Sequence, residues 1–176
     1  MAGSLILLDS VTASSDATVT LGTTNWDSSY NAYVVQLYGV TPATDDVKLY
    51  MRCNKASDNS VDSTSNYDFA SKSTKTYNAF EEDSDQNEDA WKLMAQEVGT
   101  GTSETANGTI WLFEFNNASE FSYFTMEMTC VDDSAYLHGA QGGGILSVNQ
   151  ACNGVTFHMG SGNIASGEFR LYGLKK

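Results

Sequence analysis

The residues most able to do acid–base chemistry near neutral pH are two histidines, His138 and His158. His158 falls at an outward position of a predicted strand, and His138 lies beside a glycine-rich run, so we interpret both as surface or packing residues.

Gly160-Ser161-Gly162 lacks the spacing of a nucleophile elbow. Gly142-Gly143-Gly144 lacks the spacing and the basic residue of a phosphate-binding loop. Paired carboxylates for glycoside hydrolysis stay open, because such pairs converge only in space. The sequence therefore predicts no enzyme, no catalytic residue and no cofactor.

An acidic run over residues 81–89 invites a calcium interpretation. Asp83, Asp85 and Asn87 alternate as in an EF-hand loop. Glu88 stands where that loop needs glycine, however, and Met94 stands where it needs a bidentate glutamate. We therefore expect no metal site, and a solvated loop that exposes Asp83 and Asp85.

A second polar segment, residues 54–66, is rich in turn-forming residues. It is predicted to be a surface loop that exposes Asp58 and Asn59. These two loops are the candidate exposed loops of the chain.

Charge and composition narrow the classes of partner. The 176 residues carry a formal net charge of −13, which disfavours binding to a polyphosphate backbone or to anionic lipid. We expect no nucleic acid and no membrane partner. No apolar run approaches the length of a membrane span, and residues 5–8 are too short for a signal-peptide core, so synthesis without export is expected. The three cysteines contain no CxxC pair and are predicted to be buried free thiols.

The elements that must position these residues are strands, because apolar residues recur at every second position through most of the chain. About ten short strands are expected, and no linker divides them. The sequence predicts one all-β domain over residues 1–176: a two-sheet antiparallel β-sandwich, jelly-roll-like in topology.

One predicted strand, residues 109–115, is apolar on both faces. Ile110 and Leu112 alternate with three aromatic residues, so the strand is central or lies at a subunit interface. An ordinary large sandwich core remains the alternative. The candidate interface residues are Trp111, Phe113, Phe115 and Tyr172.

Three segments resemble a widespread group of small virion proteins of tailed bacteriophages and prophages. The opening Leu5-Ile6-Leu7-Leu8-Asp9-Ser10-Val11-Thr12-Ala13-Ser14-Ser15 resembles their first block, and the segment over residues 30–44 resembles the next one. The ending Ser161-Gly162-Asn163-Ile164-Ala165-Ser166-Gly167, followed by Phe169-Arg170-Leu171-Tyr172-Gly173-Leu174, resembles their last block closely. Residues 53–108 carry no motif of the group.

The resemblance implies a non-enzymatic β-sandwich on the virion exterior, made in the bacterial host cytoplasm. Capsid decoration, as a cement protein, is favoured over a tail-fibre or receptor-binding head. The implied partners are other virion proteins, further copies in a homo-oligomer that we expect to be a trimer, and a host surface glycan or protein. From another class, a free carbohydrate-binding module remains an alternative, and it needs an exposed platform of two or three aromatic residues.

Overall fold

The computed structural model describes residues 4–77, 80–94 and 96–175. They form twelve strands in two antiparallel sheets, with one 3-10 turn at Thr23–Asn25. The large sheet has eight strands, in the order β1 (Ser4–Asp16), β12 (Ile164–Lys175), β3 (Ala32–Pro42), β8 (Ala106–Phe113), β9 (Ser122–Val131), β10 (Leu137–Leu146), β5 (Tyr67–Lys75) and β6 (Glu81–Glu88). The small sheet has four, in the order β2 (Val19–Gly22), β11 (Cys152–Met159), β4 (Leu49–Lys55) and β7 (Trp91–Lys92).

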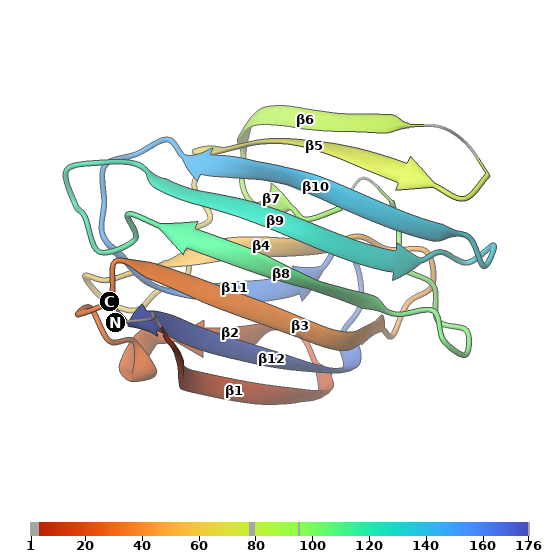
Figure 1. The fold of residues 1–176 in the computed structure, drawn as a ribbon, viewed down its shortest axis with the longest axis horizontal. Coiled ribbons are helices and arrows are strands. Elements are labelled where there is room, and N and C mark those ends of the chain that lie inside the picture. The colour runs from red at the N-terminus through yellow and green to blue at the C-terminus, as the bar shows by residue number, and fades with distance from the viewer. Residues whose placement is uncertain (1–3, 78–79, 95, 176) are drawn as a thin grey trace.

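The predicted antiparallel β-sandwich is confirmed, with twelve strands instead of about ten. Figure 1 looks onto the large sheet, with the small sheet behind it. The chain crosses repeatedly between the two sheets, as in a jelly roll. No helix among the described residues is long and apolar enough to span a membrane.

The core lies between the inner faces of the two sheets. Trp91 of the small sheet packs against Tyr67 and Phe124 of the large sheet, with ring centroids 4.9 and 4.8 Å away. Its indole N–H donates to the Ile145 carbonyl at 3.0 Å, so this buried polar group is satisfied. A Cβ at Gly144 would lie 2.6 Å from the Phe124 ring. The glycine run in β10 thus permits close approach, and no bulge interrupts the pairing of β10.

The three segments that carry the virion-protein resemblance become adjacent strands. The ending forms β12, which lies between β1 from the opening segment and β3 from the segment over residues 30–44. The pairing begins at Ser4 opposite Lys175 and runs to Asp16 opposite Ile164. Sequence blocks from both ends of the chain therefore build one continuous part of the large sheet.

The acidic run is a strand and not the predicted loop. β6 is the outer edge of the large sheet and pairs with β5 from Glu81 opposite Ser73 to Glu88 opposite Tyr67. Asp83 and Asp85 therefore lie on an edge strand, and Asp83 is half-buried. Lysines offset the charge: Lys75 pairs with Glu81, and Lys92 lies 3.1 Å from Asp83. An edge strand can be solvated on both faces, so it lacks the apolar alternation by which strands are recognised.

Candidate interaction surface on the large sheet

The outer face of the large sheet carries an apolar patch at the end where β1 begins and β12 ends. Alternation turns one residue in two toward this face. Cross-strand pairing places Leu5 opposite Leu174, Leu7 opposite Tyr172, and Phe113 opposite Tyr123. The apolar patch consists of outward-facing apolar residues on β1, β12, β3, β8, β9 and β10. Its members are Leu5, Leu7, Val34, Trp111, Phe113, Tyr123, Ile145, Tyr172 and Leu174.

Several members of the apolar patch are open to solvent. Leu7 is 53% exposed, Tyr123 is 41% exposed, and Trp111 and Phe113 are each 36% exposed. Val34 is buried beneath its neighbours although it points outward. Exposed apolar residues that gather across adjacent strands mark an interaction surface more often than scattered ones do. Each aromatic ring also offers a large contact area with few rotatable bonds to immobilise.

The four candidate interface residues do not all share this face. Trp111 and Phe113 point outward from β8, while Ile110 and Leu112 are buried. Tyr172 is half-buried beside them, with Val34 as its partner on β3.

Phe115 corrects the predicted alternation. Glu114 adopts a φ of 60°, which ends the strand and turns the following residue inward. Phe115 is therefore in the core, where its ring stacks on that of Trp26 with centroids 6.0 Å apart.

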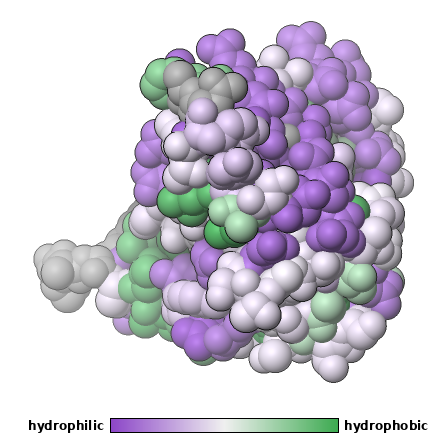
Figure 2. Space-filling view, turned by 90° about the vertical axis from the view of Figure 1, so that its right-hand side faces the viewer, coloured by the Kyte–Doolittle hydropathy of each residue, from purple (hydrophilic) through white to green (hydrophobic). Residues whose placement is uncertain are grey.

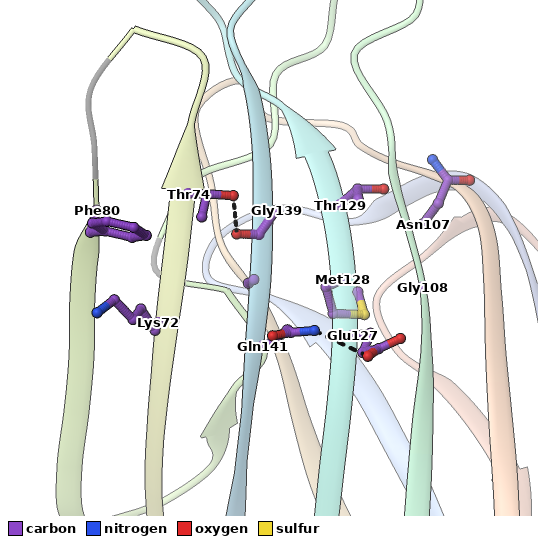
Figure 3. Close-up of a pocket in the computed structure, with 11 residues that line it drawn as sticks. Lys72, Thr74, Phe80, Asn107, Gly108, Glu127, Met128, Thr129, Gly139 and Gln141 are labelled. Carbon is purple, nitrogen blue, oxygen red and sulfur yellow. Dashed lines mark hydrogen bonds between the residues drawn. The ribbon is translucent and has the colours of Figure 1, made fainter.

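Beyond the apolar patch the outer face becomes polar and hollowed. A groove of about 620 Å³ crosses the sheet from Phe80, which precedes β6, to Asn107 on β8. Figure 3 shows Lys72, Gln141 and Glu127 lying side by side across β5, β10 and β9. The Gln141 amide donates to the Glu127 carboxylate at 3.1 Å. Gly139 faces outward between Thr74 and Thr129. Because glycine has no side chain, the groove stays open at this point.

The end of the sandwich opposite the termini is largely hydrophilic. Figure 2 views this end, where hydrophobic residues form only small, separate groups. The predicted loop residues Asp58 and Asn59 lie exposed in the turn after β4, which is at the other end of the sandwich, near the termini. The Asp58 carboxylate accepts hydrogen bonds from Ser60, which lower the pKa of Asp58 below its ordinary value.

A buried cluster brings a thiol, an imidazole and a carboxylate together. Cys130 pairs with His138 across β9 and β10, and His138 Nε2 lies 2.7 Å from Asp132 Oδ2. His138 is completely buried, so it is a packing residue and not a surface one. Burial raises the pKa of the Cys130 thiol to about 12, so the thiolate that a nucleophile requires is not formed near neutral pH.

His158 is also a packing residue in this structure. Its ring stacks on Tyr50 with centroids 5.3 Å apart, and its Nδ1 lies 3.0 Å from the Met159 carbonyl oxygen. Burial lowers the pKa of His158 below its ordinary value. Within the described residues, no group of three or more His, Cys, Asp or Glu side chains is placed to hold a metal ion. Cys53, Cys130 and Cys152 are buried free thiols.

Sequence reasoning missed the groove. Its signal is the alternation of Gly139, Gln141 and Gly143 along β10, which leaves one face of a strand with little side-chain volume. The missing side-chain volume on the outer face follows only from the pairing of β10 with its neighbours.

Comparison of the chain with protein-family models, with curated proteins and with solved structures gave no match.

Proposed function

We propose that the protein is a non-enzymatic structural protein of the exterior of a tailed-phage particle and that it works through protein–protein contacts. The observation that carries the proposal is the apolar patch, an exposed aromatic and aliphatic surface over strands that include all three segments with the virion-protein resemblance. Capsid decoration is the favoured role. In that role many copies must stand side by side on a lattice.

Neighbouring copies are the occupants that fit the apolar patch best. Each chain carries a net charge of −13, so polar surfaces of two copies repel one another. An uncharged contact avoids that repulsion, and burial of apolar area supplies about 25 cal/mol per Å² removed from water. The Trp111 and Phe113 rings lie near the middle of the patch, where the residues that dominate binding tend to cluster. The proposed assembly is a trimer.

Electron microscopy of intact particles tests the location. Density for this chain, or for an antibody bound to it, that is spread over the phage capsid supports capsid decoration. Density confined to the tail supports the alternative role of a receptor-binding domain of a tail fibre. Absence of the chain from purified particles would overturn the virion proposal.

The contact surface is tested with the isolated protein and matched variants. Trp111→Ser with Phe113→Ser should convert the oligomer to a monomer in size-exclusion chromatography with light scattering. Tyr38→Ser with Tyr136→Ser removes two aromatic residues of similar exposure outside the apolar patch and should leave the oligomer intact. A wild-type monomer at micromolar concentration, or dissociation in the control alone, contradicts the proposed interface.

The tail role has one observation of its own. The polar groove lies toward the end of the large sheet away from the termini, and it adjoins the apolar patch at Trp111, which lines one hollow together with Glu127 and Gln141. An open polar groove suits recognition of a host surface molecule.

A further inference from the structure

The groove on the large sheet has the length of an extended ligand. Its lining comes from the segment before β6 and from β5, β10, β9 and β8. Neighbouring strands lie about 4.8 Å apart, so five such segments span roughly 20 Å. That length suits a short oligomer that lies across the strands better than a single small molecule.

The floor of the groove is backbone flanked by hydroxyl groups. Gly139 has Thr74 on one side and Thr129 on the other, in register on β5 and β9. The Thr74 hydroxyl donates a long hydrogen bond to the Gly139 carbonyl at 3.4 Å. Both threonine side chains are exposed, so their hydroxyls are accessible to a ligand.

The middle of the groove holds a preorganised amide–carboxylate pair. Gln141 Nε2 donates to Glu127 Oε1 at 3.1 Å, which fixes both side chains on the sheet surface. The Gln141 carbonyl and the second Glu127 oxygen remain as acceptors, and the amide has a second N–H. A hydroxyl group of a ligand both donates and accepts, so it can bridge such a pair.

An aromatic wall and a cation close one end. Phe80 is 62% exposed, and the Lys72 ammonium lies 4.4 Å from its ring centroid. Figure 3 shows Phe80 and Lys72 beside each other at the β6 end of the groove. Phe80 offers an apolar surface for the C–H face of a ring, and Lys72 adds further hydrogen-bond donors.

We propose that this groove binds a neutral oligosaccharide. Sugars combine adjacent hydroxyl groups with apolar C–H faces, and the groove sets hydroxyls, an amide–carboxylate pair and one exposed aromatic ring along one line. With Phe80 as its single aromatic residue, the groove is not the two- or three-ring platform expected of a free carbohydrate-binding module, so its polar groups carry the recognition. Lys72 and Glu127 balance each other within the groove, while the chain as a whole is strongly acidic. The field of the protein therefore disfavours sulfated and sialylated chains.

This inference goes beyond the proposed structural role and is independent of where the protein sits on a particle. The isolated protein is first applied to a printed array of neutral and acidic oligosaccharides. The strongest neutral hit then serves as the probe in isothermal titration calorimetry. Neutral hits are expected, and an array without them, or one dominated by sulfated or sialylated chains, would overturn the proposal.

Variants locate the site. Gly139→Val fills the floor; the added Cβ would meet only the Thr74 hydroxyl, at 3.2 Å, and valine is a good strand residue. Gln141→Ala removes the amide while leaving the strand unchanged. Each should weaken binding at least about tenfold, the loss expected when a well-placed polar contact or its space is removed.

The control is an exposed aromatic residue that does not line the groove. Tyr38→Ala should keep the affinity within about twofold, as for a surface change away from a site, whereas Phe80→Ala should weaken it. Loss in Trp111→Ala with retention in the three groove variants would instead place the sugar on the apolar patch and overturn the assignment. Circular dichroism of every variant separates lost binding from lost fold. Failure of glycan binding leaves the particle-localisation result unaffected, so the two proposals fall separately.

Discussion

At the scale of single residues, Gly167 has the conformation that explains the glycine in the C-terminal block. Its φ is 138°, and a Cβ there would lie 2.8 Å from Val40 Cα. It lies within a register shift between Ser166 and Glu168 in the pairing of β12 with β3, next to a second shift between Ile164 and Ser166. Gly167 thus allows β12 to bend against β3 where any other residue would be both strained and in contact with backbone.

Gly167→Ala should therefore lower the free energy of unfolding by about 3 kcal/mol or more, because backbone strain and a steric clash add. Gly39→Ala is the matched control: Gly39 also has a positive φ, of 57°, but nothing lies within 4 Å of an added Cβ. Its cost should be about 1 kcal/mol, from strain alone. Urea unfolding measures both values, and equal losses would show that the contact with Val40 is relieved by a shift of the backbone.

Asp62 fastens the loop after β4 to the rest of the sandwich. Its carboxylate accepts hydrogen bonds from the Thr64 backbone N–H at 2.9 Å and from the Gln150 amide at 2.5 Å. Burial alone would raise the pKa of Asp62, but these hydrogen bonds and that of the Thr64 hydroxyl hold it below its ordinary value. The folded state therefore releases this proton more readily than the unfolded state does.

Above the unfolded-state pKa of about 3.9 the full contribution of Asp62 is present, and it is lost as the pH falls through the lower folded-state pKa. Asp62→Asn should lower stability at pH 7, because one amide N–H₂ then faces the Gln150 amide, and it should flatten the loss of stability in acid. Urea titrations between about pH 5 and about pH 2, across the range in which this contribution is lost, test this, and an unchanged acid slope in the variant would contradict it. Asp58 and Asp132, whose pKa values are also lowered, keep part of the slope in both proteins.

At the scale of elements, the two edges of the large sheet differ in chemistry. β6 presents an acidic edge, whereas β1 presents Leu5, Ile6 and Leu7, all exposed. Charged edges resist pairing with another chain, and apolar edges invite it. The acidic edge therefore directs association toward β1 and the adjoining apolar patch.

Neutralising β6 should convert it to an aggregation site. Glu82→Thr with Asp85→Thr replaces two exposed carboxylates by a residue that favours strands. Glu120→Thr with Asp133→Thr changes the net charge equally at exposed positions outside the strands. Light scattering during storage at high concentration should show growth of large particles in the β6 variant only. Particle growth in both double variants would show that the lower net charge, and not the loss of charge on the β6 edge strand, causes the aggregation.

A strand can be predicted from the sequence when one of its faces packs on the core and the other does not. β8 was predictable because Ile110 and Leu112 face the core and alternate with the outward Trp111 and Phe113. β6 was not, because an edge strand with two solvated faces carries no apolar alternation. Phe115 was misplaced because the φ of Glu114 breaks a pattern that period counting continues. The groove escaped prediction because it depends on which strands lie beside β10, and strand order is set by contacts far apart in sequence.

At the scale of the whole molecule, the outer face of the large sheet carries two regions, the apolar patch and the polar groove, which suit different partners. The apolar patch lies at the end with the termini, and the polar groove lies toward the other end. The two regions meet at Trp111, so a contact that buries the patch reaches one side of the groove. A rigid sandwich holds the two regions in a fixed arrangement, since both belong to one hydrogen-bonded sheet.

Net charge sets the conditions under which such copies associate. Each copy brings −13 charges to the assembly, and the repulsion among them is screened over about 10 Å at 0.1 M salt and about 3 Å at 1 M. If the contact is apolar, added salt weakens the repulsion and leaves the attraction in place, so self-association should strengthen. Sedimentation velocity at about 10 mM and about 1 M NaCl, where the screening length is about 30 Å and about 3 Å, should show a larger oligomeric fraction at the higher salt. Dissociation on adding salt would mean that ion pairs hold the copies together, and it would overturn the apolar patch as the interface.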